Sequence, residues 1–458
     1  MKSEFLVKRD GKRLIVIYAG WSSDSRLYAG LRFPEGYDVA LVSGYTNLDL
    51  DLSFTEGYNS IALIAWSLGV WAAENSFPAD RLTFAVAVNG TPYPCDDLRG
   101  IPTAVFNTTR ERLDERNLRK FRRRMVSSKE DFDNLLPLLP ENDNIDSLKS
   151  ELLFISEEST RRSPDASFPW ERAYVSNSDS IFPADAQREA WKERSDVECV
   201  SVEGSHYLEL NPILTALFPE KATVGSKFHS AITTYHDEAT AQRAIASHLA
   251  DLIKTMIPSK GGKLLEIGPA TGFLTGCVAD ILRPTEADFI DLFPTGRFNI
   301  ADKESYHCCD AETWLPEQGK KWDYIVSSSV VQWFADLDSF FREASRHLDK
   351  GGLLAVSTFA PGNLPELSAA TPYGMLYHSR SRIESMLSRY FRHYYVKEGV
   401  ERLEFPTVRE ALLHIRHTGV GGGIRSGRNV RDITRAIQPD PSRPATLTYL
   451  PLYIIAYD

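Results

Sequence analysis

Residues 61–69 read Ile-Ala-Leu-Ile-Ala-Trp-Ser-Leu-Gly, and they decide the fold of the first half of the chain. The run from Ile61 to Ile64 is continuously apolar, as is typical of a strand buried inside a parallel sheet. A helix is predicted to begin directly after Ser67. A serine in such a sharp turn, with small residues two positions before and after it, forms a nucleophile elbow that exposes the hydroxyl. Ala65 stands where glycine is more usual, which is a mild departure from this pattern.

Further apolar runs on both sides of the elbow are predicted to be strands. They lie at 14–17, 38–42, 84–88, 103–106, 172–175 and 197–202. Because these runs alternate with segments of helical character, the first half is predicted to be a doubly wound α/β sheet. The alternation is interrupted at about 108–150, and this insertion is predicted to be a helical lid over Ser67.

The predicted lid contains a concentrated basic segment. Arg110 to Arg124 holds eight basic and three acidic residues, although the whole chain has a formal net charge of −10. Arginines recur at helical spacing and are expected to line one face; they are Arg112, Arg116, Arg119 and Arg123. For a charge run taken alone, a solvated helix is the simpler interpretation.

The bulk properties set the class of protein. The 458 residues are too many for one ordinary core, so two domains are expected, 1–219 and 222–458. The acidic balance argues against nucleic-acid binding, and no apolar run approaches the ~20 residues that span a bilayer. The first residues lack a signal-peptide pattern, and the five cysteines match no zinc or disulfide framework. A cytoplasmic enzyme without metal is therefore expected.

A serine nucleophile requires a base, an acid and an oxyanion hole. His206 is the one histidine in residues 1–228, and it follows the last predicted strand of the first half. Asp179 lies in the preceding loop, with Asp96 and Asp97 as weaker alternatives. The chain order Ser67, Asp179, His206 is that of α/β-hydrolases. The backbone N–H groups of Leu68 and Trp21, each after a strand, are the expected oxyanion donors.

The second half begins with a strand and a glycine-rich turn, residues 263–272, as in a Rossmann-type unit. The residues expected to bind a cofactor there are Glu266, Gly268, Ala270, Gly272, Asp291, Asp310 and Ala311. A lone glycine motif also fits a dinucleotide dehydrogenase. The acid before the first glycine, Asp291 placed 19 residues after Gly272 for the ribose, and the Asp310-Ala311 loop favour S-adenosylmethionine instead. The run 447–457 is predicted to be an antiparallel edge strand.

Two resemblances follow from these motifs. Residues 222–458 resemble the malonyl-acyl-carrier-protein O-methyltransferases of biotin synthesis, most specifically in the segment 357–367, Ser-Thr-Phe-Ala-Pro-Gly-Asn-Leu-Pro-Glu-Leu. Phe228, Tyr235, Gln242 and Val331-Gln332-Trp333 also carry this match. The first half resembles esterases that cleave pimeloyl-acyl-carrier-protein methyl ester, through Ala19-Gly20-Trp21, residues 65–69 and Asn89-Gly90-Thr91.

The resemblances imply a class I methyltransferase fused to an α/β-hydrolase, with an acyl carrier protein as the partner of both. Methylation would remove the malonyl charge, which is costly to bury in the apolar tunnels of chain-elongating enzymes, and the esterase would later restore it. Tyr235 and Arg416 are then expected at the malonyl site, and the basic lid helix becomes the expected docking face. Two alternatives stay open: a small-molecule methyltransferase fused to an unrelated carboxylesterase, and a chain with one non-catalytic half that only binds carrier protein.

Overall fold

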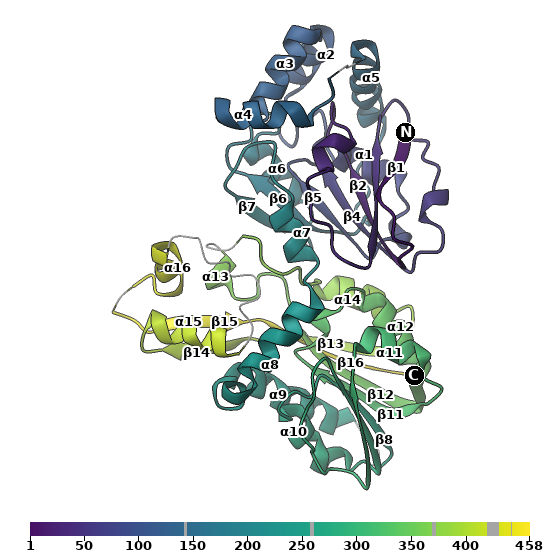
Figure 1. Ribbon diagram of the computed structural model, residues 1–458, viewed down its shortest axis with the longest axis vertical. Helices are drawn as coiled ribbons and strands as arrows, with labels where there is room; N and C mark the ends of the chain where they lie inside the picture. Colours follow the sequence, from purple (N-terminus) through teal and green to yellow (C-terminus); the bar gives the residue numbers. More distant parts are fainter. Residues whose placement is uncertain (142–143, 257–260, 369–371, 419–429, 441) are drawn as a thin grey trace. The chain divides into compact units, whose positions relative to one another are not determined.

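The computed structural model describes residues 1–458 apart from 142–143, 257–260, 369–371, 419–429 and 441. The chain divides into two compact units, Met1–Thr215 and Ala216–Asp458. Each unit is an α/β structure with its own seven-stranded sheet, and both sheets can be followed in Figure 1. None of the described helices has the length and apolar character needed to cross a membrane.

The sheet of the first unit has the strand order β1-β3-β2-β4-β5-β6-β7. Its strands are β1 (Lys2–Val7), β2 (Arg13–Tyr18), β3 (Tyr37–Ser43), β4 (Ser60–Trp66), β5 (Phe84–Val88), β6 (Trp170–Ser176) and β7 (Glu198–Val202). Only β1 runs antiparallel to its neighbour. Every residue of β4 is buried, as its unbroken apolar sequence predicts. The carboxyl ends of the parallel strands therefore meet at one edge, where Ser67 follows β4.

Helices α2 to α5 interrupt the first unit between β5 and β6. They are α2 (Thr103–Glu111), α3 (Glu115–Arg124), α4 (Lys129–Leu135) and α5 (Ile145–Arg161). The prediction of a strand at 103–106 was wrong, because this run begins α2. Only Phe106 of these four residues is buried, so the apolar run is one turn of a helix on Pro102 and not a strand buried on both faces. The remaining helices of this unit are α1 (Gly69–Ser76) and α6 (Ala184–Lys192), with α7 (Asn211–Leu217) at its end.

The second unit has the strand order β10-β9-β8-β11-β12-β16-β13. Its strands are β8 (Lys263–Ile267), β9 (Glu286–Asp291), β10 (Lys303–Cys308), β11 (Trp322–Ser328), β12 (Leu348–Phe359), β13 (His393–Glu398) and β16 (Pro451–Tyr457). A separate pair consists of β14 (Glu401–Phe405) and β15 (Ala445–Tyr449). The predicted edge strand 447–457 is therefore two strands, and the edge itself is β13. Proline 451 lacks an N–H for the ladder, and the chain changes sheets at this point.

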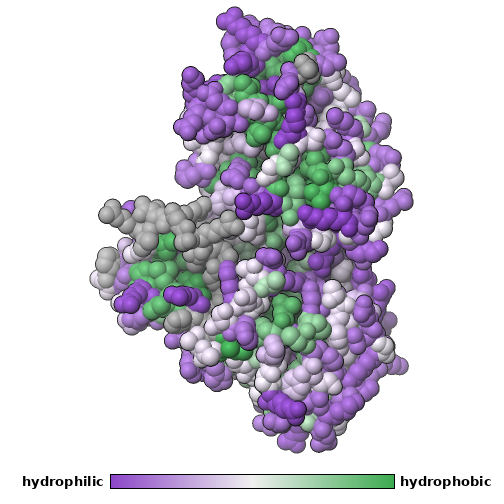
Figure 2. Space-filling model, viewed as in Figure 1, coloured by the Kyte–Doolittle hydropathy of each residue, from purple (hydrophilic) through white to green (hydrophobic). Residues whose placement is uncertain are grey.

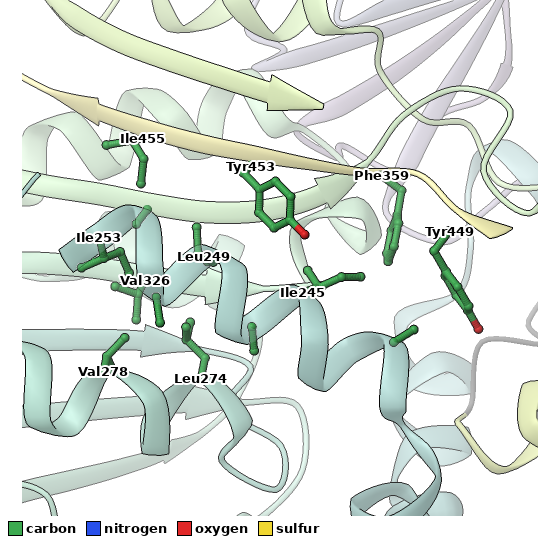
Figure 3. Packing of buried hydrophobic residues seen from close by; sticks show 14 of the residues in the cluster. Ile245, Leu249, Ile253, Leu274, Val278, Val326, Phe359, Tyr449, Tyr453 and Ile455 are labelled. Carbon is green, nitrogen blue, oxygen red and sulfur yellow. The ribbon is translucent and has the colours of Figure 1, made fainter. Parts of the chain in front are cut away.

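Helices pack against the second sheet, and the hydrophobic core of the unit consists of side chains from both. They are α8 (Lys221–Glu238), α9 (Thr240–Met256), α10 (Phe273–Leu282), α11 (Ala311–Trp314), α12 (Leu337–His347), α13 (Pro365–Ser368), α14 (Arg380–Leu387), α15 (Val408–His417) and α16 (Val430–Ile437). Figure 3 shows Ile245, Leu249 and Ile253 of α9 packed with residues from α10 and the sheet. The spacing of these three residues gives α9 one apolar face, which packs against the sheet and α10.

Candidate functional sites

The turn at Ser67 is strained and tightly packed. Ser67 has φ +61° between β4 and α1, a left-handed conformation that non-glycine residues seldom adopt. A Cβ atom on Gly90 would lie 2.3 Å from the Ser67 carbonyl oxygen, and one on Gly69 would lie 2.7 Å from the Tyr18 carbonyl oxygen. Small residues at these positions therefore allow the turn that presents Ser67 at the end of β4.

The three residues predicted as a triad lie in one hydrogen-bonded line. His206 Nε2 is 2.9 Å from Ser67 Oγ, and His206 Nδ1 is 2.9 Å from Asp179 Oδ2. All three are buried, with 4%, 1% and 8% of Ser67, His206 and Asp179 exposed. The alternatives have other partners, since Asp96 pairs with Arg99 and Asp97 accepts from the Thr103 N–H. The arrangement suits a base that accepts the serine proton while a carboxylate orients the base.

Further side chains, for which the sequence indicated no role in the site, hold Asp179 and His206 in place. Asp179 Oδ1 accepts from the N–H groups of Ile181 (2.8 Å) and Phe182 (2.9 Å), and Asp179 Oδ2 accepts from Gln187 Nε2 (3.1 Å). The His206 carbonyl accepts from Asn89 Nδ2 (2.9 Å) and Trp66 Nε1 (3.0 Å). The one available signal was the Asn89-Gly90 pair directly after a strand, because asparagine tolerates the left-handed conformation that Asn89 adopts, φ +46°.

A cavity of about 420 Å³ opens beside Ser67. Trp21 and Leu68, the predicted oxyanion residues, line it together with Ser67. Its other walls are apolar and come mostly from the inserted helices: Ile101, Val105, Phe106, Phe121, Leu152 and Ile181. Thr109 and Arg124 add polar groups. The inserted helices therefore supply most of the apolar walls of the cavity beside Ser67.

The predicted basic face is present only in part. Arg116 and Arg119 are exposed on α3, whereas Arg123 is half-buried and donates to the Val126 carbonyl (2.9 Å). Arg112 ends α2 and does not belong to α3, because Asp114 caps a new helix by accepting from the Asn117 N–H. The prediction that these four arginines line one face of a single helix was therefore wrong. Figure 2 shows a mainly hydrophilic surface over α3 and α4.

The second unit carries a cleft of about 690 Å³ at the carboxyl ends of β8, β9 and β11. The predicted residues that line it are Tyr235, Gly268, Ala270, Asp291, Asp310 and Ala311. Gly268 has φ +68°, and a Cβ atom there would lie 2.4 Å from a Val330 methyl group. Gly272 has φ +88° and begins α10, where a Cβ atom would lie 2.7 Å from the Phe298 ring. The turn thus requires glycine and brings its backbone close to the cleft.

Two carboxyl groups near the glycine-rich turn are destabilised as anions: Asp291 lines the cleft, whereas Glu266 is buried and, like Gly272, does not line it. Burial raises the pKa of Glu266 to about 8, and Glu266 Oε2 has no hydrogen-bond partner among the described residues. Burial also raises the pKa of Asp291 to about 6, although Asp291 Oδ2 accepts from the Ala270 N–H (3.1 Å). Such groups gain most from a ligand that donates hydrogen bonds or carries positive charge.

The far side of the cleft holds an ion pair that the sequence did not suggest. Lys221 Nζ lies 2.6 Å from Asp310 Oδ2 and also contacts Glu312. Tyr235 belongs to a cluster of rings, with its centroid 6.1 Å from that of Phe228 and 5.8 Å from that of Phe273. Arg416, in contrast, is exposed on α15 and does not line the cleft.

Comparison with known proteins agrees with the two-unit architecture. A family model described as "Pimeloyl-ACP methyl esterase BioG" matches residues 1–213, and one described as "Methyltransferase domain" matches residues 239–400. The expected Rossmann-like methyltransferase fold of the second unit is thereby confirmed.

Individual relatives cover one or both units. A malonyl-[acyl-carrier protein] O-methyltransferase of Bacteroides fragilis is 33% identical over 461 residues, which cover 97% of this chain and 93% of the relative. One of Porphyromonas gingivalis is 32% identical over 240 residues, 50% of this chain and 93% of the relative. The crystal structure of BioG from Haemophilus influenzae covers 45% of this chain and 94% of its own, with 36% identity and a TM-score of 0.43. This chain is a fusion of an N-terminal BioG domain with a C-terminal methyltransferase domain, and it belongs to the family of malonyl-[acyl-carrier protein] O-methyltransferases.

Proposed function

We propose that the chain has two activities of biotin synthesis, and that its methyltransferase unit methylates the free carboxylate of malonyl-acyl-carrier protein. The proposed donor is S-adenosylmethionine, which supplies an electrophilic methyl group on a sulfonium sulfur. The buried Glu266 carboxyl with an unpaired oxygen is the observation that supports this donor best, because it lies beside the glycine turn and suits the methionine ammonium group. Asp291 would accept from the ribose hydroxyls, and Asp310 with Ala311 would hold the adenine.

The protein's part in the transfer is to bind, orient and exclude water. A malonyl carboxylate is ionised at neutral pH, so no general base is required. Tyr235 and the rings around it provide a water-poor wall on which the reacting groups would be held. Arg416 was predicted to hold the malonyl group, but its side chain is exposed and does not line the cleft, so the structure gives this prediction no support.

For the first unit we propose an α/β-hydrolase that removes the methyl group from pimeloyl-acyl-carrier-protein methyl ester. The strand order, the single antiparallel strand and the positions of Ser67, Asp179 and His206 support this fold. His206 Nε2 would accept the Ser67 proton as Oγ attacks the ester carbonyl. The N–H groups of Trp21 and Leu68 would stabilise the oxyanion, methanol would leave, and water would hydrolyse the acyl-enzyme. The apolar cavity suits the methylene chain.

The place of action that we propose is the cytoplasm. None of the five cysteines forms a disulfide, which agrees with a reducing compartment. The carrier protein, which is strongly acidic, would be shared by both activities, and the exposed Arg116 and Arg119 of α3 are proposed to meet it through charge complementarity.

Single-residue variants of the full chain test both activities together. Ser67→Ala should lose hydrolysis of pimeloyl-carrier methyl ester and keep methylation of malonyl-carrier, as measured by mass spectrometry of the carrier protein. Asp291→Ala should show the opposite pattern. Each variant should also rescue only one of two biotin auxotrophs that lack one activity each. Loss of both activities in either variant, or of neither, would contradict the assignment.

A further inference from the structure

The basic segment of the lid contains one arginine that does not face solvent. Arg122 is 5% exposed, although it is flanked by the half-exposed and exposed side chains of Phe121, Arg123 and Arg124. It lies one helical turn after the buried Leu118, so the two residues share the inward face of α3. Burial of a guanidinium is costly unless its N–H groups are hydrogen-bonded, so the partners of Arg122 indicate what this burial achieves.

Those partners include the loop that carries the oxyanion donor. Arg122 Nη2 donates to the Ser22 carbonyl oxygen at 3.0 Å, and Arg122 Nη1 donates to the Pro140 carbonyl oxygen at 3.1 Å. Ser22 directly follows Trp21, is 6% exposed, and has φ +62°. A non-glycine residue in this conformation is strained and persists only when its surroundings hold it. Arg122 is one of the groups that hold it.

The same loop is fastened to the sheet on its other side. The Ala19 N–H donates to the Val42 carbonyl (2.9 Å), and Tyr45 OH donates to the Ala19 carbonyl (2.6 Å). A Cβ atom on Gly20 would lie 2.4 Å from the Trp66 ring, so the loop also passes closely over the end of β4, directly before Ser67. The sheet therefore fixes the beginning of the loop, and the lid contacts its end.

Two further contacts join the lid to Trp21 itself. Trp21 Nε1 donates to the Leu148 carbonyl of α5 at 3.2 Å, and the Trp21 ring meets the Phe121 ring of α3 edge to face at 4.9 Å between centroids. With Arg122, the lid thus contacts the oxyanion loop at three points. The position of the Trp21 N–H group depends on these contacts, because it lies between the sheet-fixed and the lid-fixed parts of the loop.

We infer that Arg122 is a positioning residue for ester hydrolysis: it ties the lid to the oxyanion loop and takes no part in docking the carrier protein. This inference rests on the proposed esterase function. The arginines of the basic segment then have two different roles. Arg116 and Arg119 face solvent, whereas Arg122 points inward and positions the oxyanion loop through its hydrogen bond to Ser22. An oxyanion donor displaced by about 1 Å can lower the rate roughly a hundredfold.

The test uses a substrate without a carrier protein. In the full chain, Arg122→Met should lower kcat for p-nitrophenyl acetate by roughly tenfold to a hundredfold while KM changes little. The inhibition constant of a trifluoromethyl ketone, which binds as an oxyanion, should rise in parallel, and Arg122→Lys should recover part of both losses. Lys120→Met is the matched control, because this exposed residue of α3 also carries one positive charge, and it should keep the wild-type values.

The outcomes separate this inference from the proposed function. If the wild-type chain fails to hydrolyse the small ester above the level of Ser67→Ala, the esterase function itself is wrong. If the wild type is active and Arg122→Met retains its kcat and its inhibition constant, the positioning role is wrong. Should Arg122→Met fail to fold, Arg122→Lys decides, because a lysine keeps the charge but not the reach of the guanidinium: a lowered kcat supports the inference and a wild-type kcat overturns it.

Discussion

At the scale of single residues, Glu266 links the stability of the methyltransferase unit to pH. Burial raises the pKa of Glu266 from 4.5 to about 8. Between these two pH values the folded protein holds a proton that the unfolded chain has released, so the free energy of unfolding falls as pH rises through this window. A neutral amide of the same shape does not titrate, so its contribution to the free energy of unfolding would not change with pH.

We therefore expect Glu266→Gln to be more stable than the wild type at pH 9, with the difference disappearing near pH 5. The expected gain in Tm is on the order of 10 °C, because a rise in pKa from 4.5 to about 8, at about 1.4 kcal/mol per pH unit, corresponds to roughly 5 kcal/mol. Calorimetry of the full chain without ligand measures it, and the same variant should bind S-adenosylmethionine more weakly. Glu317→Gln, at an exposed glutamate, is the control. A gain that is equal at pH 5 and pH 9 would contradict the prediction.

The site residues that the sequence could predict were those that belong to a recognisable motif. Ser67, Asp179 and His206 follow strands in a fixed order, so pattern and elimination locate them without coordinates. Gln187 and Arg122 could not be found in this way. Gln187 lies in a polar helix and Arg122 in a run of arginines, and only the three-dimensional packing shows that they point inward at Asp179 and Ser22. Side-chain direction within a charged helix depends on its partners, which a single sequence does not contain.

At the scale of elements, α3 presents part of its positive charge to solvent. Arg116 and Arg119 are exposed, whereas Arg122 is buried. Reversing the two exposed charges should raise KM for pimeloyl-carrier methyl ester by about tenfold at low salt, since each pair lost or reversed is worth about 0.7 kcal/mol. The effect should shrink as salt screens the charges, and kcat for p-nitrophenyl acetate should stay near the wild-type value.

Steady-state kinetics of Arg116→Glu/Arg119→Glu on both substrates measures this. The double variant Lys192→Glu/Lys303→Glu, at two exposed lysines outside α3, controls for the same change of four units in net charge. An equal loss on the carrier-bound and the small ester would show that the helix had been disrupted, and it would contradict a docking role.

The sequence predicted helices and strands correctly where an apolar pattern was long, and the prediction was wrong where the pattern covered only a few residues. The unbroken apolar run of β4 was predicted correctly as a buried strand. The run 103–106 was too short to distinguish a strand from a helical turn, and only its partly exposed environment on the lid decides it. The run 447–457 has strand-forming residues on both sides of Leu450, so its sequence resembles one long strand. Pro451 was the one residue that indicated a break, because proline has no N–H group for the ladder.

At the scale of the whole molecule, one chain holds a proposed activity that makes a methyl ester and another that cleaves one. Futile hydrolysis is avoided if the Ser67 site rejects the malonyl ester. The cavity beside Ser67 has apolar walls from Phe106, Phe121 and Leu152. A pimeloyl chain would fill it with methylene groups, whereas a malonyl chain would bring its thioester and the polar pantetheine arm against the same walls. Each methylene group left unburied costs about 0.8 kcal/mol.

The kcat/KM for pimeloyl-carrier methyl ester should therefore exceed that for malonyl-carrier methyl ester by more than tenfold, which the loss of about two buried methylene groups already accounts for. The decisive measurement follows malonyl-carrier and S-adenosylmethionine over time with the wild-type chain and with Ser67→Ala. If the cavity selects by chain length, both proteins accumulate malonyl methyl ester at the same rate and to the same yield. A markedly lower yield with the wild type would mean that Ser67 cleaves the product of its own chain, and selection would then have to lie outside the apolar cavity.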